Sequence, residues 1–213
     1  MRIGVIGAGN VGKTLGGQLA TKHTVKYGCR DPAKHPGIGA APVPSVCDWA
    51  EVLLVCTPGF STAAEAEALA TSFGPGVRGK VFIDATNPLS AWPKLEGALP
   101  SSYVFKAFNT IGLEHMAALG PQGAAVFGGE AAAIERGPIT MLYAGAEEKR
   151  AVAAAIISDV GFDPRYVGPI RYARNLEAIA ELWIHCGIGA AGLNPTVDWG
   201  GDFAFQVVGG RKG

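Results

Sequence analysis

Residues 2–12 read Arg2-Ile3-Gly4-Val5-Ile6-Gly7-Ala8-Gly9-Asn10-Val11-Gly12, an apolar run followed directly by a G-x-G-x-x-G turn. The apolar run predicts a buried strand over Arg2–Ile6, and the amphipathic segment behind the turn predicts a helix over Asn10–Lys22. In this strand–turn–helix context, backbone N–H groups at the start of the helix can face a pyrophosphate. The stretch therefore predicts a dinucleotide site; the alternative is an ordinary glycine-rich strand–helix turn.

The three glycines of the motif have separate roles in such a site. Gly7 permits the tight turn, Gly9 lets the main chain approach the phosphates, and Gly12 lets the helix pack closely on the strand.

Strand and helix patterns alternate along the rest of the chain. Further strands are predicted over Thr24–Cys29, Val52–Cys56, Val81–Ala85, Tyr103–Phe108, Thr140–Ala144 and Pro164–Val167. Further helices are predicted over Thr62–Ser72 with Ser61 as its cap, over Glu147–Val160, and from Ala173 to about Ala190. The stretch up to Pro44 predicts a short helix and another strand, Gly120 to Gly137 an irregular excursion, and Phe203–Val208 a strand-like tail. This alternation predicts an α/β fold with a doubly wound, parallel Rossmann-type sheet and a small C-terminal helical and extended extension.

Polar turn residues follow several of the predicted strands. They are Gly7–Gly12, Arg30, Thr57-Pro58, Thr86-Asn87-Pro88 and Asn109-Thr110. Because ligands of doubly wound sheets bind beyond the carboxyl ends of the strands, we expect all of these residues to face one crevice.

The tip of the second predicted strand indicates which dinucleotide is bound. Sites that prefer NAD place an acid there against the ribose hydroxyls, whereas an arginine suits a 2′-phosphate. The strand ends in Cys29 and Arg30, and Lys34 offers a second cation. This pattern favours NADP(H). The alternatives are that Asp31 is the ribose acid or a helix cap, and that Arg30 is a solvated loop cation.

Composition excludes several classes of partner. Of the 213 residues, 48% are hydrophobic and 17% charged, which is typical of a folded globular chain. Lysine and arginine together number 18, as do aspartate and glutamate, so the net charge is zero. Nothing in this balance favours nucleic acid or an anionic membrane, and we expect a small-molecule redox cofactor as the partner.

The cysteines and the chain termini suggest a cytoplasmic protein. None of the four cysteines stands in a C-x-x-C pair, which predicts reduced thiols and no metal site. The first strand begins at residue 2, leaving no room for a signal peptide. The most apolar long stretch, Ala178 to Leu193, carries Glu181 and His185 and is too short to span a bilayer.

The four histidines offer little acid–base chemistry. His23 and His35 are predicted to face solvent, and His185 to be a hydrogen-bonded core residue. His115, just past the Asn109-Thr110 turn, either approaches the nicotinamide or lies on a helix surface.

No recognisable nucleophile motif or metal motif stands out in the sequence. Lys106 is either a catalytic cation or, more commonly at a strand end, a structural or phosphate-side residue. Direct hydride transfer to a second redox cofactor needs alignment of two rings rather than a protein acid or base. The catalytic residue is therefore left unassigned, with Asn109 and His115 as candidates.

Several stretches together resemble the coenzyme F420-dependent NADP oxidoreductase family. They are residues 2–12, Cys29-Arg30-Asp31-Pro32, Asp84-Ala85-Thr86-Asn87-Pro88-Leu89, Lys106-Ala107-Phe108-Asn109-Thr110 and Gly168 to Glu177. The resemblance covers nearly the whole chain. It implies hydride exchange between NADPH and the 5-deazaflavin ring of F420, or a flavin-type acceptor, in a homodimer.

The resemblance also assigns residues to the two cofactors. It implies that Gly9, Asn10 and Val11 meet the pyrophosphate, Arg30 and Lys34 the 2′-phosphate, and Asn87, Pro88 and Asn109 the nicotinamide and deazaflavin. Cys29 departs from the serine or threonine that related chains often carry, which removes one phosphate hydrogen bond. Residues 1–168 are expected to form the NADP-binding Rossmann domain, and residues 169–213 a small C-terminal region that packs on the cofactor crevice.

Two other functions stay open at this stage. One is a small NADPH-dependent dehydrogenase or reductase of an imine or keto substrate, although about 45 residues after Gly168 are few for the helical domain of such enzymes. The other is a non-catalytic NADP(H)-binding sensor.

Overall fold

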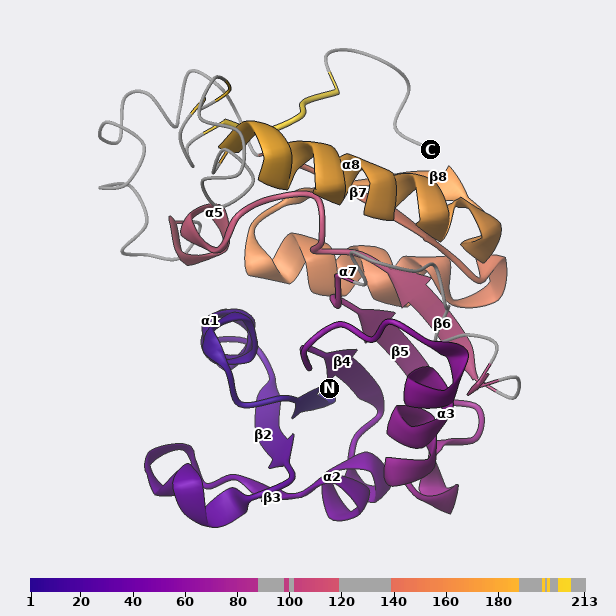
Figure 1. Cartoon of the computed structure of the whole chain (residues 1–213). Coiled ribbons are helices and arrows are strands. Elements are labelled where there is room, and N and C mark those ends of the chain that lie inside the picture. The colour runs from indigo at the N-terminus through magenta and orange to yellow at the C-terminus, as the bar shows by residue number, and fades with distance from the viewer. Residues whose placement is uncertain are drawn as a thin grey trace.

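One eight-stranded sheet runs through the described residues of the computed structural model, which are 1–87, 98–99, 102–118, 139–187, 197, 199 and 203–207. The strands are β1 (Arg2–Ile6), β2 (Thr24–Cys29), β3 (Ala41–Pro42), β4 (Val52–Val55), β5 (Val81–Asp84), β6 (Tyr103–Lys106), β7 (Thr140–Gly145) and β8 (Asp163–Gly168). Their order across the sheet is β3-β2-β1-β4-β5-β6-β7-β8 (Figure 1). The first six strands thus follow the 3-2-1-4-5-6 order of doubly wound nucleotide-binding folds.

The direction of the last two strands differs from the predicted all-parallel sheet. The strands from β3 to β6 are parallel, but β7 pairs with β6 in the antiparallel sense, and β8 lies parallel to β7. A short apolar run has the same appearance in either orientation, so the sequence pattern could not reveal this reversal.

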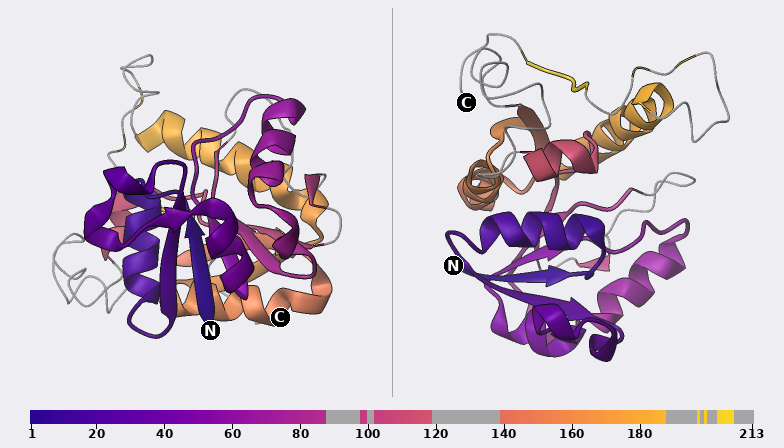
Figure 2. Two further views of the ribbon diagram at one scale, coloured as in Figure 1. Left: turned by 90° about the horizontal axis from the view of Figure 1, so that it is seen from below. Right: turned by 90° about the vertical axis from the view of Figure 1, so that its left-hand side faces the viewer.

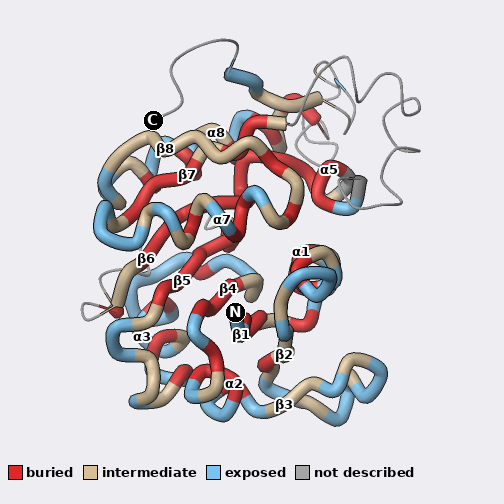
Figure 3. The backbone as a smooth tube through the Cα atoms, turned by 180° about the vertical axis from the view of Figure 1, so that it is seen from behind, coloured by how far each residue is buried: buried red, intermediate tan, exposed pale blue. Residues whose placement is uncertain are grey.

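Helices cover both faces of the sheet (Figure 2). They are α1 (Asn10–Leu19), α2 (Val43–Trp49), α3 (Ala63–Ser72), α5 (Leu113–Ala118), α7 (Arg150–Val160) and α8 (Ala173–Gly187). One hydrophobic core joins one face of the sheet to α1 and α7, and a second joins the other face to α2 and α3. The central strands are buried on both sides as a result (Figure 3), while α8 packs on β6 and β7.

Several local predictions need correction. Thr62, rather than Ser61, caps α3: its Oγ1 accepts the Glu65 N–H at 3.2 Å, and the Glu65 carboxylate accepts the N–H groups of Thr62 and Ser61. Helix α1 ends at Leu19 rather than at Lys22, and the helix α2 was not predicted. Residues 203–207 form no strand; instead their backbone and side chains hydrogen-bond to Thr140.

None of the described helices is both long and apolar enough to cross a membrane.

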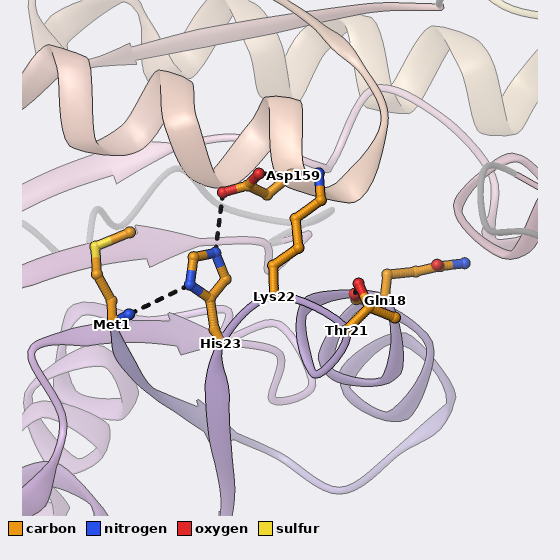
Figure 4. A network of polar contacts seen from close by, with 6 residues as sticks. All are labelled: Met1, Gln18, Thr21, Lys22, His23 and Asp159. Atoms are coloured by element: carbon orange, nitrogen blue, oxygen red, sulfur yellow. Dashed lines mark hydrogen bonds and ion pairs between the residues drawn. The ribbon is translucent and has the colours of Figure 1, made fainter.

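A polar network joins the start of β2 to the end of α7 (Figure 4). His23 Nε2 lies 2.9 Å from Asp159 Oδ2, and Lys22 Nζ lies 3.0 Å from Asp159 Oδ1. The prediction that His23 faces solvent is therefore wrong, since only 9% of its side chain is exposed. The other loop histidine, His35, is partly exposed.

This network makes part of the stability dependent on pH. Burial raises the pKa of Asp159, but the hydrogen bonds from Lys22 and His23 outweigh burial, so the pKa lies below its ordinary value of 3.8. Such a carboxyl stabilises the fold above its unfolded-state pKa and loses that contribution as the pH falls through its folded-state pKa. We expect Asp159→Asn to lower the free energy of unfolding by about 1 kcal/mol near neutral pH, and by progressively less below about pH 4.

Urea unfolding across this pH range measures the effect. Glu147→Gln is the control, because Glu147 makes an exposed ion pair with Arg150 and should change stability little. An Asp159→Asn deficit that stays constant down to about pH 3 would contradict the expectation.

Candidate functional site

The carboxyl ends of five strands lie side by side. The register pairs Ile6 with Gly28 and with Val55, Val55 with Asp84, and Asp84 with Lys106. The backbone extends this alignment beyond the strands, because Gly7 N donates to Gly28 O and Cys56 N donates to Ile6 O. The turn residues predicted to share a crevice therefore follow strand ends at one edge of the sheet.

At two of the three glycines in the turn, any larger residue would collide with the backbone. Gly7 has a φ of +109°, and a Cβ there would lie 2.5 Å from Cys56 O. A Cβ on Gly12 would lie 2.0 Å from Gly7 O, so α1 can pack on the turn only with glycine at this position. A Cβ on Gly9 would meet no atom within 4 Å, so contact with the protein does not require glycine there.

Helix α1 begins without a capping side chain. Gly9 is the N-cap residue, no side chain accepts a hydrogen bond from the first turn, and that turn contains no acidic residue. Lys13 N is the first amide to donate within the helix, to Gly9 O at 2.9 Å. The N–H groups of Asn10, Val11 and Gly12 are therefore available, at the positive end of the helix dipole, to an anion such as a pyrophosphate.

Substitution of Gly12 tests this geometry. Because the Gly12→Ala methyl group would collide with Gly7 O, we expect the free energy of unfolding to fall by about 1–3 kcal/mol and dinucleotide affinity to be lost. Gly17→Ala in the same helix is the matched control, since a Cβ there meets nothing within 4 Å. It should raise stability by about 0.5–1 kcal/mol. Urea unfolding and a nucleotide titration measure both effects; equal behaviour of the two variants would refute the steric argument.

The strand-end cations lie at the tip of β2. Arg30 is exposed and makes no hydrogen bond or ion pair with any described residue. Lys34 Nζ lies 3.2 Å from Asp31 Oδ2, in an exposed ion pair. Cys29 is partly buried and is a free thiol. Arg30 is thus the cation in this group without an acidic partner in the described structure.

Buried polar atoms without partners mark the ends of β4, β5 and β6. They are Thr57 Oγ1, Asn87 Oδ1, and both Oδ1 and Nδ2 of Asn109, and none of them has a hydrogen-bond partner among the described residues. Folded proteins satisfy nearly all buried polar groups, so four such atoms along three adjacent strand ends point to a ligand with donors and acceptors. Pro58, beside Thr57, is exposed, and Pro88 lies outside the described residues.

The backbone just before Asn109 is strained. Phe108 has a φ of +64°, the left-handed region that aromatic residues rarely adopt. Two contacts hold it there: its N–H donates to Met141 Sδ at 3.1 Å, and its ring packs edge-on against Phe162 at 6.0 Å. Strain of this kind persists where the surroundings fix a residue in place.

Burial distinguishes between the predictions made for two histidines. His115, on α5, is not on the helix surface: it is fully buried, and its ring packs edge-on against Trp183 of α8, with centroids 6.4 Å apart. His185 is only partly buried, so its assignment to the core is wrong.

Thiolate chemistry is not available at Cys56, which directly follows β4. Burial, together with the nearby charge of Asp84, raises the pKa of the Cys56 thiol well above its ordinary value, so it stays protonated at neutral pH.

A buried ion cluster lies beside the unpartnered amides. Lys106 Nζ is 3.2 Å from Asp84 Oδ2 and 3.1 Å from Glu177 Oε1, which α8 supplies. Of the two roles predicted for Lys106, the structural one fits this arrangement. Glu177 was not predicted; the available signal was an acid on the face of the helix that also carries Leu176, Ala180 and Trp183.

This sheet order and glycine turn define a Rossmann-type, doubly wound α/β fold. No protein-family model and no curated protein matches the sequence.

Solved structures do match. The chain is similar to a protein from Arthrobacter sp. FB24 whose proposed activity is that of an F420-dependent NADP reductase, with a TM-score of 0.72, 24% identity, and coverage of 98% of this chain and 99% of that one. It is also similar to a hypothetical protein from Sinorhizobium meliloti, with a TM-score of 0.65, 18% identity, and coverage of 98% and 96%. An imine reductase from Aspergillus terreus in complex with NADPH4 matches with a TM-score of 0.58 and 20% identity over 90% of this chain but 62% of its own.

Proposed function

We propose that this chain is an NADP(H)-dependent oxidoreductase that transfers a hydride between NADP(H) and F420 or a flavin-type acceptor. The observation that carries the proposal is a row of polar groups without hydrogen-bond partners among the described residues, along one edge of the sheet. It begins at the uncapped N-terminus of α1 and continues through Thr57, Asn87 and Asn109. This row suits an extended dinucleotide with a phosphate-rich middle and a polar, planar end.

Different residues of the chain would bind different parts of the dinucleotide. The N–H groups of Asn10, Val11 and Gly12 would hold the pyrophosphate, and Arg30 would bind the 2′-phosphate through its forked guanidinium. Thr57 would face the middle of the dinucleotide. Lys34, paired with Asp31, would add weaker electrostatic attraction.

The two asparagines would orient the reacting rings. A carboxamide offers both a donor and an acceptor, so Asn87 and Asn109 can pair with the carboxamide of a nicotinamide or the ring edge of a deazaflavin. When bound, NADPH supplies the hydride. The protein contributes alignment and exclusion of water, and no side chain needs to give or take a proton.

The choice of F420 or a flavin over other acceptors rests on the sequence resemblance and on the proposed activity of the Arthrobacter protein. The likeness to an imine reductase in complex with NADPH4 supports the alternative acceptor, an imine or keto substrate. Of the two catalytic candidates, His115 carries the imidazole that could transfer a proton in such chemistry, and Asn109 could only hydrogen-bond to the substrate. A homodimer and a cytoplasmic location are further parts of the proposal.

An acceptor panel separates these functions. Wild-type protein is mixed anaerobically with NADPH, and the loss of reduced nicotinamide absorbance is followed on adding F420, FMN, or a set of imines and keto acids. We expect rapid oxidation with F420 or FMN and not with the organic substrates. Turnover with an imine alone would instead establish the alternative. NADPH binding without turnover on any acceptor would favour a sensor.

A further inference from the structure

Lys106 is the centre of a buried cluster of charged and polar groups. Its ammonium group touches oxygens from three parts of the fold: Asp84 on β5, the Thr86 backbone at 2.6 Å, and Glu177 on α8. Exposed fractions of the Lys106, Asp84 and Glu177 side chains are 2%, 7% and 4%. An ammonium group removed from water needs close partners of opposite charge, so all three contacts are held at fixed positions.

The cluster fixes the turn that carries Asn87. Asp84 Oδ1 accepts hydrogen bonds from both the backbone N–H and the hydroxyl of Thr86, at 2.9 and 2.7 Å. Lys106 Nζ holds the Thr86 carbonyl from the other side. The backbone of Thr86 is thus bound at both its N–H and its C=O, directly before Asn87, whose Oδ1 is one of the unpartnered atoms of the site.

The same ammonium group also fixes α8. Glu177 is a buried acid among the apolar residues by which α8 packs, including Leu176 and Ala180. Its carboxylate reaches Lys106 at the last residue of β6, at the edge of the sheet where the site lies. A movement of α8 along β6 would therefore change the ion pair and, through Lys106, the Thr86 turn.

We propose that Lys106 is a positioning residue that couples the seating of α8, through Glu177, to the orientation of Asn87 at the ring-binding end of the site. The proposal rests on the proposed NADP(H) site and concerns its acceptor side. The ends of β1 and β2, which would bind the phosphates, lie outside the cluster. Disturbing Glu177 should accordingly affect the ring end of the site and leave dinucleotide affinity nearly unchanged.

Glu177→Gln tests this coupling with little change in side-chain size. Hydrogen exchange of backbone amides is measured with and without NADPH. In the wild type, we expect NADPH to slow exchange both in the glycine turn and in α8. In Glu177→Gln, protection of the turn should persist while protection of α8 falls by about tenfold. Glu177→Asp, which keeps the charge but shortens the reach, is the second variant and should give a smaller loss.

Kinetics provide the second readout. For Glu177→Gln we expect the KM for the acceptor to rise by about tenfold and the NADPH Kd to stay within about twofold of wild type. Asp163→Asn is the matched control, since it neutralises a partly buried carboxylate paired with Arg165 on β8, outside the cluster. If NADPH affinity falls, the acceptor KM rises and the melting temperature falls together, Glu177 has a merely structural role and the proposal is overturned.

The two proposals can fail separately. If the wild type shows joint protection of the turn and α8, and Glu177→Gln keeps both, the coupling is wrong whatever the turnover. If joint protection is lost in Glu177→Gln but no acceptor oxidises NADPH, the coupling is supported and the redox function is wrong.

Discussion

Lys106→Met is expected to lower the free energy of unfolding by about 3–5 kcal/mol, a larger loss than Asp159→Asn or Gly12→Ala should cause. Methionine is close to lysine in length, so packing is nearly preserved and the loss comes from charge. Without the ammonium group, Asp84 and Glu177 are two buried carboxylates facing each other without a cation. Neither can return to water without moving β5 or α8.

Urea unfolding at neutral pH measures the loss. Lys13→Met is the control, because Lys13 is exposed and should change stability by less than about 0.5 kcal/mol. The triple variant Asp84→Asn, Lys106→Met, Glu177→Gln removes all three charges and should recover much of the stability, since the cost arises from uncompensated charge. A triple variant no more stable than Lys106→Met would show that packing, not charge, explains the loss.

Arg30→Ala is expected to weaken NADPH binding by about 10- to 100-fold while NADH binding changes by less than about threefold. Arg30 is exposed at the tip of β2 and has no partner in the described structure, so its guanidinium is available for charge-assisted hydrogen bonds to a 2′-phosphate. NADH has no such phosphate. The loss of affinity should therefore be confined to NADPH.

Fluorescence titration of each variant with NADPH and NADH measures this selectivity. Arg78→Ala is the matched control: Arg78 is also exposed but precedes β5, at the opposite edge of the sheet, and its removal should change neither affinity. Equal weakening of NADPH and NADH by Arg30→Ala would assign Arg30 to the pyrophosphate or to the fold instead.

Much of the fold could be predicted from local patterns. Arg2–Ile6 and Thr24–Cys29 are predicted and observed with the same bounds, because an apolar run between turn residues is a strong local signal. The glycine turn could be placed for the same reason. The reversal at β7 could not, since a strand's partner and direction depend on tertiary packing.

The candidate site, like the fold, could be predicted from the sequence only in part. Asn87 and Asn109 could be proposed from their positions after predicted strands, because the carboxyl ends of parallel strands share one edge. The partners of His23 and Lys106 could not be predicted from the sequence. Asp159 is 136 residues from His23, and Glu177 comes from a helix whose apolar spacing predicts a core face rather than an ion pair.

Transfer of an isotopic label tests the central claim most directly. NADPH carrying deuterium at the nicotinamide C4 position that donates the hydride is mixed anaerobically with F420 and the protein in ordinary water. If the two rings exchange a hydride directly, reduced F420 should carry the deuterium, with none lost to solvent. NADPH that stays unoxidised both with F420 and in a parallel mixture with FMN, or deuterium from the F420 reaction that reaches only water, would contradict the proposed function.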